Sequence, residues 1–167
     1  MSEIEEMLSL FEKNTAQMLA MIAGLTEDQI NWKLPPVENE EHWSIRQIIA
    51  HIEEVNYFWV PQFQEALMNP STKLGRADEG NKIRQRAVDK ADERELSVMV
   101  ENIKKSLPII RNALGNMTNE QLKLVFPMKD VETNVPIGFL INHVYPEHVD
   151  THMKQIERTL LDYAQYH

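Results

Sequence analysis

The sequence predicts an all-α protein: a four-helix bundle with long crossover connections between its helices. Glycine is scarce, with 5 among 167 residues, so the chain offers few sites for tight turns. Apolar residues recur at spacings of three and four along four long segments, which is the pattern of amphipathic helices. The segments between them are long, whereas an up-down bundle joins its helices with short loops. The length fits a single domain, which we expect to cover residues 1–167.

The first two long helices begin with capping signals. One is expected at residues 2–23, and its apolar residues return every three or four positions. The other is expected at residues 44–67, with a kink at Pro61. Each starts at a serine followed three residues later by Glu or Gln, the spacing of a capping box. These pairs are Ser2 with Glu5 and Ser44 with Gln47.

The second half of the chain provides the other two long helices. Residues 69–94 are polar and charged, so we expect a long connection with a short helix near residues 81–87. The third long helix is expected at residues 95–114, with a bend at Pro108. The fourth is expected at residues 136–163, beginning at a proline, which suits the first turn of a helix.

The sequence also repeats itself at an offset of 92 residues. Residues 25–30 correspond to residues 117–122, and each segment contains a Thr-x-x-Gln capping box. The apolar positions around His51 match those around His143. The repeat therefore implies a pseudo-twofold bundle, with long crossings between the first and second and between the third and fourth long helices.

The composition excludes several classes of function. A net charge of −9 disfavours nucleic acids and anionic membranes, because phosphate binding needs a basic surface. The chain has no cysteine, so nitrogen and oxygen atoms must hold any metal. The acidic N-terminus lacks a signal-peptide pattern and no apolar run reaches about 18 residues, so we expect a cytoplasmic protein without membrane spans. Acidic pairs such as Glu53 and Glu54 are expected on a solvated face.

Two histidines in the fourth helix are the main candidates for chemistry. His148 and His152 are four residues apart, so on a helix they face the same way at a separation that one metal ion can bridge. At 100° per residue, both fall within the apolar face, where a polar ring needs a partner. Gln155 lies close to this face and could orient an imidazole ligand, whereas Asp150 points away.

The third ligand is open on the residues alone. His51 lies at the margin of the apolar face of the second helix and completes a three-histidine site if the helices bring the rings together. The alternative is a site at His143 and Glu147, which are also four residues apart. His143 lies about 140° around a straight helix from His148, so it cannot join that pair unless Pro146 bends the helix.

Two segments of the chain resemble the DinB-like superfamily. They are Trp43 to Ile52, which contains His51, and the run Glu147-His148-x-x-x-His152-x-x-Gln155-Ile156. The resemblance implies a four-helix bundle that binds a divalent metal, usually zinc or nickel, through His51, His148 and His152. His143 is outside the motif. Many members of this superfamily form dimers, so a homodimer is also implied.

The resemblance further implies a metal-dependent enzyme. Its bacillithiol S-transferase and mycothiol-dependent branches use the metal to activate a low-molecular-weight thiol, and other members are presumed to activate water. We therefore expect a thiol or water to attack a small electrophilic substrate, with thiol S-transfer preferred over hydrolysis. The catalytic and cofactor-binding residues beyond the metal ligands are not identifiable. The competing hypothesis is a non-catalytic, metal-binding or stress-associated helical bundle.

Overall fold

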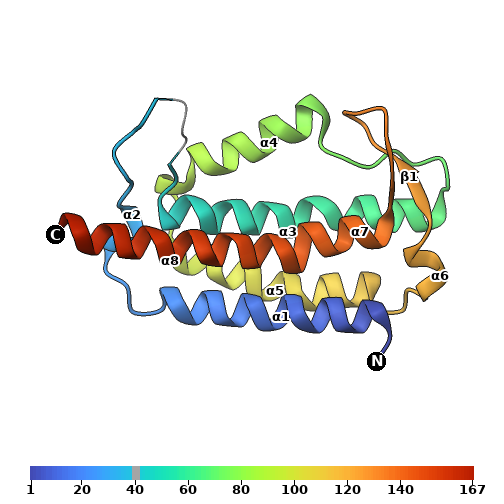
Figure 1. Ribbon diagram of the computed structural model, residues 1–167, viewed down its shortest axis with the longest axis horizontal. Coiled ribbons are helices and arrows are strands. Elements are labelled where there is room, and N and C mark those ends of the chain that lie inside the picture. The colour runs from blue at the N-terminus through green and yellow to red at the C-terminus, as the bar shows by residue number, and fades with distance from the viewer. Residues whose placement is uncertain (39–41) are drawn as a thin grey trace.

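The computed structural model describes residues 1–38 and 42–167 and confirms the predicted bundle. Its four long helices run along the long axis of the molecule (Figure 1). They are α1 (Glu3–Ile22), α3 (Ile45–Met68), α5 (Leu96–Leu114) and α8 (His148–Tyr166). Apolar side chains from all four helices pack together in one core, among them Phe11, Ile49, Ile103 and Ile156. None of the helices in the described ranges is long and apolar enough to cross a membrane.

The longest crossing lies between α3 and α5. This connection carries α4 (Ala77–Asp89) and the short 3-10 helix η1 (Ala91–Glu93), and it returns along the length of the bundle, so α3 and α5 run in the same direction (Figure 1). The connections from α1 to α3 and from α5 to α7 (Ile137–Asn142) each join helix ends that lie at the same end of the bundle (Figure 1), so the crossing lies between α3 and α5 and not, as the repeat implied, within each repeat unit. The helix α4 is also longer than the predicted segment 81–87.

Capping boxes lie at the N-termini of several helices, as the sequence predicts. Ser44 and Gln47 form a complete box at α3. The two repeat-related boxes are also complete, at α2 (Glu27–Asn31) and α6 (Asn119–Leu122). At α1, the Ser2 side chain accepts a hydrogen bond from the Glu5 backbone at 3.4 Å.

The fourth long helix is interrupted. It consists of α7 (Ile137–Asn142), a π-helical turn η2 (His143–Glu147) and then α8. Pro146 lies in this turn and has no backbone N–H to donate to the preceding turn. The Asn14 side chain of α1 donates to the Pro146 carbonyl at 3.3 Å, which ties the turn to the bundle. A π-turn adds a residue to one helical turn and is frequently found at functional sites.

A two-stranded antiparallel sheet was not expected from the sequence. Strand β1 (Val125–Pro127) pairs with β2 (Asn134–Pro136), and Phe126 lies opposite Val135. The backbone N–H of Leu74 donates to Pro127 and its carbonyl accepts from Lys129, so the hairpin is tied to the segment between α3 and α4. Strands of three residues are too short to show an alternating apolar pattern, which is why sequence reasoning missed them.

Candidate metal centre

The bundle brings His51, His148 and His152 together. His51 comes from α3, and the other two come from successive turns of α8. The His148 Nε2 atom lies 3.0 Å from His51 Nε2 and 3.1 Å from His152 Nε2. Within the described part of the chain, these three form the one cluster of histidine, aspartate or glutamate side chains arranged to hold a metal ion. That they ligate a metal stays a prediction.

The donor atoms fit a divalent cation. Two nitrogens bound to one tetrahedral zinc ion at 2.0–2.1 Å are about 3.3 Å apart, close to the separations seen here. One imidazole N–H cannot donate well in two directions, yet His148 Nε2 faces two other ring nitrogens. A cation bound between the three Nε2 atoms would accept a lone pair from each of them, so no nitrogen would face another without a partner.

The surroundings keep the three rings neutral, as metal ligands must be. Burial, followed by the charges of His152, Arg84 and Arg76, lowers the pKa of His51 from 6.5 to about 3. Burial also lowers the pKa of His148 well below its ordinary value. The pKa of His152 is lowered by burial, although a hydrogen bond with Gln155 opposes this shift. Protons therefore do not compete for these nitrogens at neutral pH.

Two neighbouring side chains hold the rings in place. Gln155 Oε1 lies 2.8 Å from His152 Nδ1, as the sequence predicted, so His152 presents its Nε2 to the other histidines. The Trp43 ring packs edge-on against His51 at 5.1 Å and stacks on His152 at 6.3 Å between ring centroids. Sequence reasoning placed Trp43 at the start of α3 but did not connect it with the metal centre.

The alternative site does not join this centre. The His143 side chain is 64 % exposed and its Nδ1 lies 3.4 Å from Glu147, which is 55 % exposed. The His143 ring also stacks on Phe139 at the surface. Asp150 likewise points away from the centre and pairs with Lys154 at 2.7 Å.

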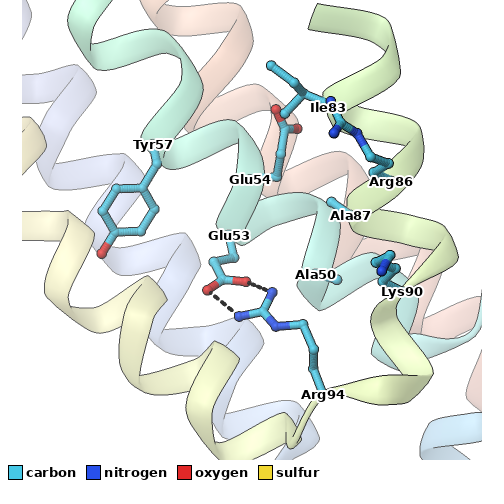
Figure 2. A pocket seen from close by; sticks show the side chains of 9 residues that line it. All are labelled: Ala50, Glu53, Glu54, Tyr57, Ile83, Arg86, Ala87, Lys90 and Arg94. Atoms are coloured by element: carbon cyan, nitrogen blue, oxygen red, sulfur yellow. Dashed lines mark hydrogen bonds and ion pairs between the residues drawn. The ribbon is translucent and has the colours of Figure 1, made fainter.

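Two hollows are lined in part by residues next to the three histidines. One, of about 530 Å³, shares Trp43 and Gln155 with the centre and is otherwise lined by α8 and by the loop before α3, including Leu34 and Val37. The other, of about 520 Å³, lies between α3 and α4 (Figure 2). Glu53 and Glu54 line this second cleft and are largely buried, which corrects the expectation of a solvated acidic face. Glu53 pairs with Arg94 there (Figure 2).

Comparison with known proteins agrees with this architecture. The sequence profile described as the DinB superfamily matches residues 10–156. YfiT from Bacillus subtilis, described as a probable metal-dependent hydrolase with an unusual four-helix bundle topology, is 15% identical with a TM-score of 0.73, covering 94% of this chain and 87% of YfiT.

Two further solved structures have a similar fold. The colibactin self-resistance protein ClbS, solved with double-stranded DNA, is 12% identical with a TM-score of 0.69, covering 93% of this chain and 94% of its own. A protein from Streptococcus pneumoniae is 12% identical with a TM-score of 0.68, covering 93% of this chain and 88% of its own. No curated protein matches the sequence significantly. At these identities, the structural likeness establishes the fold alone.

Proposed function

The chain belongs to the DinB superfamily, and from this premise we propose that it is a metal-dependent enzyme whose His51, His148 and His152 hold a divalent ion. The observation that carries the proposal is the convergence of three neutral Nε2 atoms from two helices. Three imidazoles suit zinc or nickel, the ions we propose. An ion held this way lowers the pKa of a bound water or thiol and thereby supplies a nucleophile near neutral pH.

The residues around the histidines prepare the site. Gln155 fixes the ring orientation of His152, and Trp43 packs against two of the three rings. The hollow of about 530 Å³ next to Trp43 and Gln155 is the proposed entry for the substrate, since its volume falls within the range of small-molecule sites. We therefore propose a small electrophilic molecule as the substrate.

Two nucleophiles fit this site equally well. The superfamily resemblance favours a low-molecular-weight thiol, which would make the protein a thiol S-transferase. The description of YfiT favours water, which would make it a hydrolase. The described residues that line this hollow are compatible with either nucleophile, and the assays below distinguish the two.

A non-catalytic metal-binding bundle is the second candidate. One observation favours it: among the described residues, the carboxylate nearest to the histidines is Glu54, at 3.8 Å from His51, and Arg76 already binds it. A hydrolytic site would more usually show an uncommitted carboxylate or histidine that could act as a general base.

Metal content and turnover separate these candidates. The purified protein is loaded with zinc, nickel or cobalt, dialysed, and assayed for metal by mass spectrometry. It is then tested with an activated ester for hydrolysis, and with glutathione or cysteine plus a chromogenic electrophile for thiol transfer. We expect about one metal per chain and turnover that disappears in His51→Ala but not in His143→Ala. Metal retention without turnover in both assays would favour the second candidate, and no retained metal would contradict both.

Two macromolecular partners have to be considered besides a small substrate: DNA and a second copy of the chain. ClbS was solved with DNA, but the net charge of −9 here disfavours binding to phosphates. We propose that DNA is not a partner, and expect no mobility shift of a duplex at about 50 mM salt. The homodimer implied by the superfamily stays a prediction, which sedimentation velocity tests directly.

A further inference from the structure

The far side of the His51 ring requires a hydrogen-bond acceptor. His51 directs Nε2 toward His148, so its Nδ1 faces away from the centre. This Nδ1 is buried and has no hydrogen-bond partner within the described ranges. A metal on Nε2 places the ring proton on Nδ1, and a buried N–H without an acceptor is costly. By contrast, His152 Nδ1 already has Gln155 at 2.8 Å.

The Glu54 carboxylate lies close enough to become the hydrogen-bond acceptor for this N–H group. It lies one turn along α3 from His51, and its Oε2 is 3.8 Å from His51 Nδ1. Its side chain is only 8 % exposed, so water does not satisfy the carboxylate fully. A movement of about 0.9 Å would bring the two atoms to the usual distance of a charge-assisted hydrogen bond.

Arg76 fixes the Glu54 carboxylate in this place. Its two terminal nitrogens bind the two Glu54 oxygens at 2.8 Å each. Arg76 is itself held by the Gly80 carbonyl at 3.1 Å and lies over the Phe58 ring at 4.3 Å. A carboxylate oxygen has two acceptor positions, so Oε2 can bind both Arg76 and His51. Arg76, the residue that precedes α4, thereby holds the carboxylate that lies next to His51.

The neighbouring Glu53 provides a contrast within the same helix. Glu53 is buried to a similar degree, but its carboxylate is directed to Arg94 on the other side of the cleft, whereas Glu54 is directed toward α4 (Figure 2). Asn102 also donates to Glu53, at 2.6 Å. Glu53 therefore links α3 to Arg94 and to α5, and of these two acidic residues only Glu54 lies within 4 Å of a triad histidine, His51, at 3.8 Å.

We propose that Glu54 is a positioning residue of the metal centre: held by Arg76, its carboxylate accepts the His51 Nδ1–H and thereby orients His51 Nε2 toward the ion. This inference rests on the proposed metal binding. It predicts that loss of the Glu54 charge weakens the metal complex even though Glu54 does not touch the metal. The expected loss is about 10–100-fold in affinity, as for other residues that hydrogen-bond to metal-bound histidines.

The matched variants Glu54→Gln and Glu53→Gln test this inference. Zinc affinity is measured by competition with a chromophoric chelator, after circular dichroism has shown that each variant is folded. We expect the dissociation constant to rise about 10–100-fold in Glu54→Gln and to stay within twofold of wild type in Glu53→Gln. If Glu54→Gln does not fold, the variant Glu54→Gln with Arg76→Gln, which leaves no unpaired charge, is measured in its place, with the same expected loss.

A spectroscopic measurement separates positioning from a purely structural role. In zinc-loaded wild type, nitrogen-15 NMR of the histidine rings should show the His51 proton on Nδ1 and shifted downfield by its hydrogen bond to Glu54. The shift should decrease in Glu54→Gln and persist in Glu53→Gln. Equal zinc affinities for the two variants, with an unchanged His51 Nδ1 proton, would overturn the inference while metal binding stands. A wild-type protein that binds no zinc would instead overturn the proposed function, and this inference with it.

Discussion

His51 and His143 occupy corresponding positions in the two halves of the sequence repeat, yet their surroundings are opposite. His51 is 6 % exposed and faces two other histidines, whereas the His143 side chain is 64 % exposed and faces Glu147. The helix α3 continues without interruption past His51, but His143 lies in the π-turn that divides the fourth helix. The same local pattern therefore places one histidine in the candidate metal centre and the other at the surface.

The complementary positions show the same asymmetry. At the repeat offset of 92 residues, His148 corresponds to Asn56 and His152 to Val60. Asn56 is buried and donates to Ser106 at 2.9 Å, and Val60 packs in the core. The counterparts of His148 and His152 are therefore core residues, whereas the counterpart of His51 is the exposed His143. In this chain the internal repeat therefore predicts paired helices and caps but not the position of the histidine cluster.

Replacement of a histidine in the cluster should have the greatest effect on zinc binding. His148→Ala should lower the zinc affinity by at least about 100-fold, because it removes the ring that contacts both other ligands. His143→Ala should leave the affinity unchanged, because its ring lies at the surface. Chelator competition on both variants measures the difference. Equal losses in the two variants would show that His143 also contributes to metal binding, which would contradict its placement at the surface.

The next effect concerns the pH dependence of the metal-free protein. The pKa of His51 is lowered from 6.5 to about 3 in the folded state, so between these values the unfolded chain binds a proton that the folded chain does not. Folding stability should therefore fall as the pH drops below about 6.5, with a His51 contribution of about 2 kcal/mol by pH 5. Urea unfolding in the presence of a chelator should show a shallower decline in His51→Gln and the wild-type decline in His143→Gln. A wild-type slope in His51→Gln would contradict the buried, neutral ring.

Two buried asparagines, one in each of α1 and α3, make hydrogen bonds to distant segments. Asn14 donates to the Pro146 carbonyl of the π-turn, and Asn56 donates to Ser106. Replacing either with alanine should reduce the free energy of unfolding by about 1–3 kcal/mol, because a buried partner loses its hydrogen bond. Only Asn14→Ala should also weaken zinc binding, about fivefold if the turn loses about 1 kcal/mol of ligand positioning. Unfolding curves and zinc titrations of the two variants test this; equal zinc affinities would mean that the turn does not position His148.

The smallest expected effect is a gain in stability at the π-turn. Tyr145 is fully buried against Phe11 and Phe63, and within the described residues its hydroxyl has no hydrogen-bond partner. Burial raises the pKa of this hydroxyl, so it stays protonated. Tyr145→Phe should increase the free energy of unfolding by about 1 kcal/mol, because it removes an unpaired polar group. A decrease, measured by urea unfolding, would indicate that the hydroxyl has a partner in solution.

Much of the fold was accessible from local sequence signals. The caps at Ser44, Thr26 and Thr118 form as predicted because the capping box depends only on residues three positions apart. The π-turn was not predicted, since it depends on contacts such as that between Asn14 and Pro146, which are 132 residues apart. The β-hairpin was missed because its strands are held by pairing and not by an apolar pattern.

The sequence predicted the part of the candidate site that depends on local spacing, and not the part that depends on contacts between distant segments. His148 and His152 lie one helical turn apart on the same face of α8, so their spacing predicts that their rings meet. Spacing disfavoured His143, which lies about 140° around a straight helix from His148, but it could not show that His51 meets the pair, because that depends on how α3 and α8 pack. The superfamily motif supplied His51. Glu54 and Trp43 contact the ligand rings within or next to α3, yet nothing in their spacing distinguishes them from ordinary surface and core residues.

The central claim is that one divalent ion is held by His51, His148 and His152. The most direct test is anomalous diffraction at the zinc edge from crystals grown with zinc. The claim predicts a single strong peak between α3 and α8, about 2.0–2.2 Å from the Nε2 atoms of all three histidines. A peak at His143 and Glu147, or no peak between these helices in zinc-loaded crystals, would contradict it.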